Sequence, residues 1–261
     1  MRVQLGWVLC SLVVWVGCGG QPTPEEVAAA RTAAMQSVSG ANLLMGVGDL
    51  LGLTATSTTC GEPRRTVLAH AAETFSRHLA GAACSIEPVD GGGERLVVAL
   101  PPAGVRLGTR HFRGRLFVTY TEGEARTGVE AQSEGLTVDG VPVDVSVGYL
   151  SCGDQTEYAV RLEAQVAPDV MLHLDGVLAA QDGGRFEGET FILNGAGALI
   201  GPTGTDRVTL QNLTYPLGAL GPREGDVLIE TATGHSVHAV FRKGGALGLG
   251  TARLVIDGHS A

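Results

Sequence analysis

The chain has 261 residues, of which 44% are hydrophobic and 5% aromatic, and it carries 39 glycines and a formal charge of −9. This apolar content excludes a disordered protein, and glycines without a Gly-X-Y period predict many tight turns rather than a collagen-like repeat. The acidic balance excludes nucleic acid as a partner, because that binding needs a basic face to displace counterions from phosphates.

The chain begins with Met1 and Arg2, followed by a mostly apolar run from Val3 to Val16. A transmembrane helix needs about 20 apolar residues, so this shorter run fits the apolar region of a signal peptide better. The run leads into Val16-Gly17-Cys18. This end resembles the lipobox of bacterial lipoproteins, in which a small residue precedes a cysteine that receives diacylglyceryl before the leader is removed.

The resemblance implies that residues 1–17 are a signal peptide, that Cys18 carries the lipid, and that residues 18–23 form a lipidated tether. Further acylation, for example with palmitate, would make the anchor stable, because one chain holds a protein only reversibly. The expected partner is therefore a membrane of the bacterial cell envelope. Because the residue after Cys18 is Gly19 rather than Asp, the resemblance implies that the protein is transferred to the outer membrane, where it faces the periplasm or the cell surface. Secretory cleavage near Gly19 or Gly20, or an uncleaved anchor, are the alternatives.

Two helices are expected next. Thr23-Pro24-Glu25-Glu26 is a capping box with proline at the first helical position, and it predicts a helix whose continuation is weakened by Gly40, Gly46 and Gly48. A second helix is predicted from about Glu62 to Ala80, where apolar residues recur at helical spacing until Gly81. Residues 24–82 thus form a helical segment.

From Leu96 onward, apolar residues alternate with polar ones, most clearly over 141–149 and 157–166. Further strands are predicted at 112–120, 170–178, 186–193, 208–215, 227–231, 237–241 and 252–256. Short turn-like links such as Asp182-Gly183-Gly184 require antiparallel pairing, because a parallel crossover needs a dozen or more residues. The expected fold is α+β: two N-terminal helices packed on an antiparallel meander of about ten strands over 85–261, forming a curved sheet, a partial barrel or a sandwich.

Three cysteines remain beyond the leader and the anchor, namely Cys60, Cys84 and Cys152. An oxidising envelope favours one disulfide. We expect Cys60 to pair with Cys84 across the second helix, although spacing does not fix connectivity and Cys152 is an alternative partner.

No metal or cofactor is expected. His235 and His238 are three apart in a predicted strand and so point to opposite faces, while His70 and His78 are more than two helical turns apart. The glycine-rich stretch from Gly195 to Gly201 lacks dinucleotide-loop spacing and is predicted to be a loop.

No catalytic residue is expected either. Nucleophile motifs are missing from the sequence, and the carboxylates that a glycosidase dyad would need are interpreted as solvated strand faces, because few aromatics are present to stack on sugars. These carboxylates are Glu187, Glu189, Asp226 and Glu230. Four arginines gather at 106, 110, 113 and 115, and alternation places Arg113 and Arg115 on one strand face.

The sequence therefore predicts a membrane-anchored lipoprotein that is a non-catalytic binding or structural component, with an envelope protein or an apolar ligand as its possible partner. Two alternatives stay open. One is a carrier or receptor that holds an apolar ligand between the sheet and the helices, since the apolar face of such a sheet must be covered by something. The other is a hydrolase whose site is assembled from loops.

Overall fold

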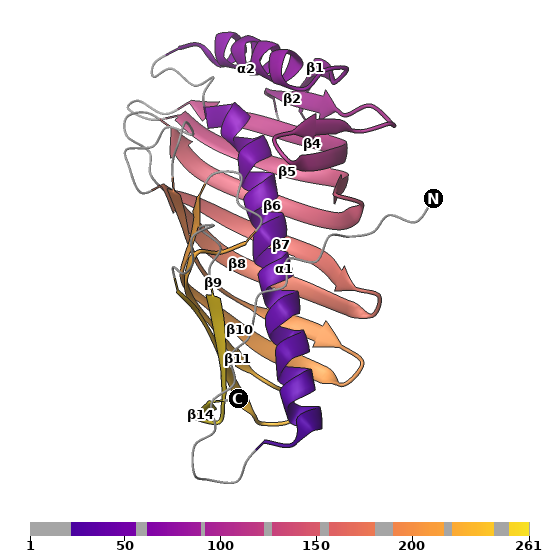
Figure 1. Cartoon of the computed structure of the whole chain (residues 1–261). Coiled ribbons are helices and arrows are strands. Elements are labelled where there is room, and N and C mark those ends of the chain that lie inside the picture. Colours follow the sequence, from indigo (N-terminus) through magenta and orange to yellow (C-terminus); the bar gives the residue numbers. More distant parts are fainter. Residues whose placement is uncertain are drawn as a thin grey trace.

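The structure is a computed structural model that describes residues 22–55, 62–89, 92–122, 127–151, 157–180, 190–216, 221–242 and 251–260. One large antiparallel sheet of fourteen strands curves around a single long helix, α1 (Pro24–Ala55), and a shorter helix, α2 (Arg64–His78), covers one end of the sheet (Figure 1). Neither described helix combines the length and hydropathy needed to cross a bilayer.

The strands follow the chain almost without interruption. They are β1 (Ala83–Pro88), β2 (Glu94–Ala99), β3 (Val105–Leu107), β4 (Arg110–Glu122), β5 (Thr127–Val138), β6 (Val141–Ser151), β7 (Glu157–Ala167), β8 (Val170–Ala180), β9 (Thr190–Gly201), β10 (Gly204–Pro216), β11 (Glu224–Glu230), β12 (Ser236–Arg242), β13 (Thr251–Ile256) and β14 (His259–Ser260). Each strand pairs with the next one along the chain, except that β2 pairs with β4, and β3 pairs with β4 beside the main path. The sheet is thus an open meander whose order runs from β1 to β14.

The α+β class expected from the sequence is wrong, because the protein is mostly β, with 59% of the described residues in strands and only two helices. The meander itself is present, but it has more strands than the sequence predicts, and the helices do not form a layer of their own. Instead α1 lies along the inner face of the sheet and shares one apolar core with the strands from β2 to β13. We call the face toward α1 the inner face and the opposite face the outer face.

The capping box predicted at the start of α1 is present, and a tight turn joins β5 to β6. At the start of α1, the backbone N–H of Thr23 donates to Glu26 Oε2 at 2.6 Å, and the N–H of Glu26 donates to Thr23 Oγ1 at 3.3 Å, which is the reciprocal capping box. At the β5–β6 hairpin, Asp139 and Gly140 have φ angles of 53° and 85°, as a two-residue type I′ turn requires.

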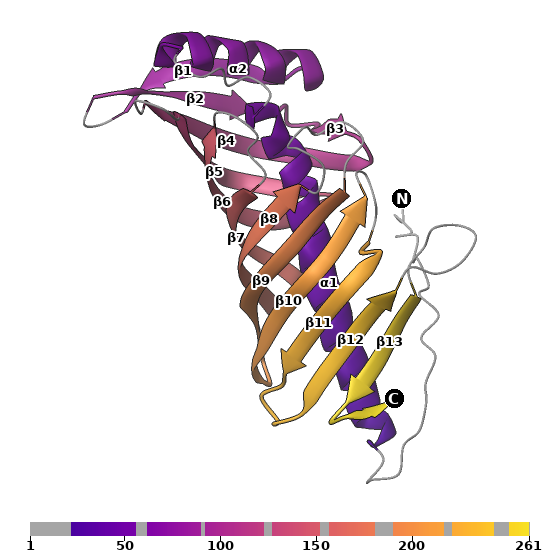
Figure 2. The ribbon, with the colours of Figure 1, turned by 90° about the vertical axis from the view of Figure 1, so that its left-hand side faces the viewer.

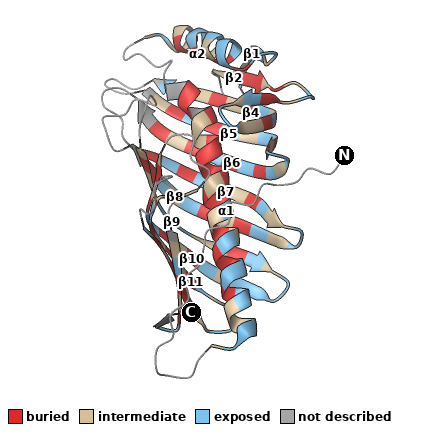
Figure 3. Cartoon of the chain, in the orientation of Figure 1, coloured by how far each residue is buried: buried red, intermediate tan, exposed pale blue. Residues whose placement is uncertain are grey.

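The glycines of α1 do not end the helix, because they face side chains of the sheet at close range. A Cβ at Gly40 would overlap the side chain of Leu172 on β8, and one at Gly46 would lie 3.4 Å from Val138 Cγ1 on β5. From Gly40 to Leu53 most described residues are buried, whereas the first half of α1 buries one face only (Figure 3). Tertiary packing thus outweighs the helix propensity cost of about 1 kcal/mol for each glycine.

The stretch from Gly195 to Gly201 is not a loop but part of β9, paired with both β8 and β10. Small residues suit this strand, because a Cβ at Gly197 would overlap the backbone carbonyl of His173, and one at Gly195 would lie 2.8 Å from the carbonyl oxygen of Asp175. Glycine at these positions allows the backbones of neighbouring strands to approach each other closely.

The packing of α1 against the sheet predicts the outcome of one substitution. Gly40→Ala should lower the free energy of unfolding by about 1–3 kcal/mol, because the added methyl group overpacks the contact with Leu172 even though alanine is the better helix former. Chemical denaturation measures the change. Ser39→Ala, at the exposed neighbouring position, is the control and should stay within about 0.5 kcal/mol of wild type. A more stable Gly40→Ala protein would contradict the close approach.

Candidate functional site

The inner face of the sheet is the first place to look for a ligand site, and α1 occupies it. The helix starts beside β12 and β13 and ends beside β4 and β5, so that it crosses nearly the whole sheet (Figures 1 and 2). Its buried side chains include Ala41, Leu44, Val47 and Leu50. The apolar face that an open carrier would present to a ligand is thus in contact with the chain's own helix.

A row of aromatic side chains lines one edge of the inner face. Each lies one or two residues from the end of its strand, and all lie at the same edge of the sheet. At this edge the connections between strands are outside the described residues: 123–126, 152–156, 181–189, 217–220 and 243–250. The row consists of Tyr120, Tyr149, Tyr158, Phe191, Tyr215 and Phe241, all buried, and it includes every tyrosine of the chain. Tyr149 and Tyr158 meet edge to face with centroids 5.0 Å apart. These side chains fill the space at this edge of the inner face, and their rings are buried.

A polar cluster interrupts the apolar contact between α1 and the sheet. Arg110, at the start of β4, turns inward, and its side chain is only 15% exposed. Its guanidinium donates to Asp139 Oδ2 at 2.9 Å and to the backbone carbonyl of Asn42 on α1 at 3.3 Å. Arg110 is the one member of the 106–115 arginine group that contacts the helix, whereas Arg113 and Arg115 lie on the outer face as alternation predicts.

The charge of Arg110 also affects the pKa of two groups with which it forms no ion pair, Asp49 and Tyr215. Burial raises the pKa of Asp49 on α1 to about 6, and the charge of Arg110 opposes that rise. Burial also raises the pKa of Tyr215, whose hydroxyl is buried and has no hydrogen-bond partner in the described part of the chain, again with Arg110 opposing. Tyr215 lies on β10, six strands from β4 in sheet order. The curvature of the sheet therefore brings Tyr215 close enough for the charge of Arg110 to affect its pKa.

A second set of charged groups holds the start of α1. His235, in the β11–β12 turn, lies 2.8 Å from Asp257 Oδ2 through Nδ1 and 3.5 Å from Glu26 Oε1 through Nε2. The hydrogen bond with Asp257 raises the pKa of His235, and hydrogen bonds from Thr23 lower the pKa of Glu26. These exposed contacts tie the first turn of the helix to the last hairpin of the sheet.

The histidines and carboxylates of the strands, for which the sequence predicts no metal or catalytic site, do not converge on one point. His238 pairs with Asp226 at 2.9 Å, separately from His235, and Glu230 pairs with Arg207 at 3.6 Å. Asp226 and Glu230 are about 13 Å apart along β11, too far for either glycosidase geometry. Among the described residues no cluster of potential metal ligands occurs. Glu187 and Glu189 lie outside them.

The cysteine predictions are only partly within the described residues, because Cys18, Cys60 and Cys152 lie outside them. Cys84 on β1 is half-buried, and its Sγ lies 3.5 Å from Ser76 Oγ near the end of α2. The alternative pairing of Cys84 with Cys152 stays a prediction, because Cys152 lies outside the described residues.

Pairing of Cys60 with Cys84 stays a prediction, because Cys60 lies outside the described residues. Cys84 lies beside Ser76, about 18 Å along α2 from Arg64. Just before α2, Glu62 Oε2 lies 3.4 Å from His70 Nδ1.

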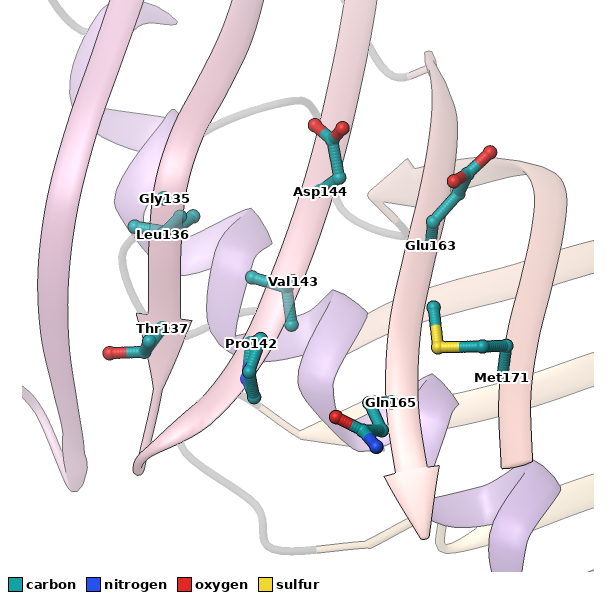
Figure 4. A pocket seen from close by; sticks show the side chains of 9 residues that line it. All are labelled: Gly135, Leu136, Thr137, Pro142, Val143, Asp144, Glu163, Gln165 and Met171. Carbon is teal, nitrogen blue, oxygen red and sulfur yellow. The ribbon is translucent and has the colours of Figure 1, made fainter. Parts of the chain in front are cut away.

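The outer face carries a shallow hollow of about 360 Å³. It lies where β5 bulges at Gly135, which has a φ of 57°, and it spans strands β5 to β8 (Figure 4). Sequence reasoning missed it, because the bulge breaks the alternation of β5. The hollow is lined by Gly135, Leu136, Thr137, Pro142, Val143, Asp144, Glu163, Gln165 and Met171.

Comparison with known proteins gives no relative for this chain: no protein-family model, no curated protein and no solved structure matches it.

The half-buried carboxyl group of Asp49 predicts a specific dependence on pH. Its raised pKa means that the folded state holds a proton more tightly than the unfolded state, so its contribution to stability is lost as pH rises from about 4 through about 6. Asp49→Asn should therefore raise the free energy of unfolding by about 1–2 kcal/mol at pH 8, after allowance for solvent screening, and by little at pH 4.

Denaturation of wild type and variant at both pH values measures this difference. Asp175→Asn, which alters an exposed carboxylate of the outer face, is the control. A destabilised Asp49→Asn protein at pH 8 would mean that the attraction to Arg110 outweighs burial.

Proposed function

We propose that this chain is a lipid-anchored component of the bacterial cell envelope with a non-catalytic binding or structural role. The observation that carries the proposal is the occupation of the inner face by α1. A protein that binds a small apolar ligand usually keeps a concave apolar cavity for it. In this chain the corresponding surface is packed against residues of its own helix, with glycines that allow close contact.

The carrier alternative requires α1 to leave this position. Displacement would expose the buried side chains of the helix and of the strands beneath it, at a cost of about 25 cal/mol per Å² of apolar surface. An acyl chain would have to offset that cost. The close packing favours the binding or structural role over the carrier role.

The hydrolase alternative has little support in the described residues. The four described histidines that meet carboxylates have different partners, and all are at least one-third exposed: His70, His173, His235 and His238. None of them lines the hollow of the outer face, although His173 contacts Glu163, which does. An active site normally combines a concave pocket with convergent titratable groups, and no histidine or cysteine is among the described residues that line the hollow.

The anchor and the fold together suggest an orientation. Residues 19–23 reach at most about 18 Å, so a lipid on Cys18 would hold the start of α1 close to the membrane. That start lies at the β12–β14 end, whereas α2 and β1 lie at the far end of a helix about 48 Å long (Figure 2). The β12–β14 end would then be proximal to the membrane and the α2 end distal.

The anchor is tested by Cys18→Ala expressed in a bacterial host with labelled palmitate. Wild type should incorporate label and fractionate with membranes, whereas the variant should incorporate none and keep the size of the precursor, because the thiol that accepts the lipid is gone. Cys10→Ala, the other cysteine of the leader, is the matched control and should be labelled like wild type. Labelling of Cys18→Ala would refute the anchor.

A further inference from the structure

The first turns of α1 are held to the sheet with little apolar packing. Ala30 is the first fully buried residue of the helix, and among residues 24–29 only Val27, itself half-buried, packs against the core. The segment lies at the β12–β14 end of the sheet (Figure 2). Polar contacts with that end must therefore contribute much of what keeps these turns in place.

His235 supplies such a contact, with one carboxylate at each nitrogen of its ring. Nδ1 lies 2.8 Å from Asp257 Oδ2 in the β13–β14 turn, and Nε2 lies 3.5 Å from Glu26 Oε1 in the first turn of α1. The other oxygen of each carboxylate is held by the backbone. Asp257 Oδ1 accepts from the N–H of Ser236 at 2.8 Å, and Glu26 Oε2 accepts from the N–H of Thr23 at 2.6 Å. The carboxylates are thus oriented toward the ring by their own surroundings.

This geometry suits the protonated form of the ring. An imidazolium has an N–H on both nitrogens, so its positive charge attracts both carboxylates. A neutral imidazole has one N–H, and the short contact with Asp257 places that proton on Nδ1. Nε2 then turns a lone pair toward the carboxylate of Glu26, and the attraction between them is lost. Deprotonation therefore releases the helix and leaves the contact with the hairpin intact.

The groups around His235 determine where this change occurs. The hydrogen bond with Asp257 raises the pKa of His235 above its ordinary value of 6.5, and the charge of Glu26 adds to the rise, while partial burial opposes it. Hydrogen bonds from Thr23 lower the pKa of Glu26, which stays ionised in this range. Asp206 on β10 also meets the β11–β12 turn, where it accepts a backbone N–H. Because the pKa of His235 is higher in the folded state, the contact is complete below about pH 6.5 and weakens as pH rises through the folded-state pKa.

We propose that His235 is a pH-sensitive clamp on the start of α1, closed when its ring is protonated and open when its ring is neutral. The open clamp allows residues 24–29 to leave the sheet, whereas the helix from Ala30 onward stays packed. One consequence rests on the lipid anchor of the proposed function. Residues 19–23 reach at most about 18 Å, but residues 19–29 reach at most about 40 Å when extended. The sheet is then held closer to the membrane at acidic pH than at alkaline pH.

Hydrogen exchange of the full chain in mild detergent tests the clamp. Rates are measured at about pH 6 and about pH 9, and each is divided into the intrinsic rate at that pH to give a protection factor. In wild type, protection of peptides covering residues 24–31 should fall about two- to fivefold from the lower to the higher pH, as expected for an exposed ion pair. His235→Gln can still donate to Asp257 but cannot become charged, so it should show the lower protection at both pH values.

His238→Gln is the matched control, because His238 also pairs with a carboxylate, but its partner Asp226 lies on β11 rather than on the helix. This variant should keep the pH dependence of wild type. Equal protection of residues 24–31 in wild type at the two pH values would overturn the proposal, and so would a pH dependence that persists in His235→Gln. The measurement does not need the lipid. A wild type that incorporates no palmitate would refute the anchor, while the exchange result would still decide the clamp.

Discussion

The close approach of α1 to the inner face of the sheet is the constraint on which the rest of the structure depends. A one-sided antiparallel sheet of this size presents a wide apolar surface that must be covered. Here a single helix covers it, and the glycines and alanines of the helix let the strands curve tightly around it. Because Gly40, Gly46 and Gly48 each face a side chain of the sheet, larger residues would hold the two apart. The curl of the sheet follows from the small residues of the helix.

Charged groups complete this arrangement at the start of the helix and just past its middle. The first turn is tied to the last hairpin of the sheet by His235, between Glu26 and Asp257. Just past the middle of the helix, Arg110 enters from β4 and donates to the backbone carbonyl of Asn42. The sheet therefore fixes the position of α1 along its axis by polar contacts, while apolar packing supplies most of the favourable free energy.

The sequence predicts the local structure of this protein better than its tertiary structure. Alternation reveals strands such as β6 and β7, and the capping box at Thr23 marks the start of α1. Alternation fails for β5 because of the bulge at Gly135. Before the bulge the buried side chains are at odd positions, Val129 and Ala131, and after it they are at even positions, Leu136 and Val138. The glycines of α1 and β9 are misinterpreted as breaks, because the packing that requires them lies far away in sequence. For the same reason the inward turn of Arg110 and the aromatic row are not predictable from local patterns.

The central claim, that α1 is a permanent part of the core, is tested most directly by native-state hydrogen exchange. Peptides covering residues 40–53 should exchange only through global unfolding, at the same free energy as peptides from β6 and β7, because helix and strands share one core. Exchange of these helix peptides at a free energy several kcal/mol lower, while β6 and β7 stay protected, would contradict the claim. The helix would then be a cover that leaves the sheet intact, as the carrier alternative requires.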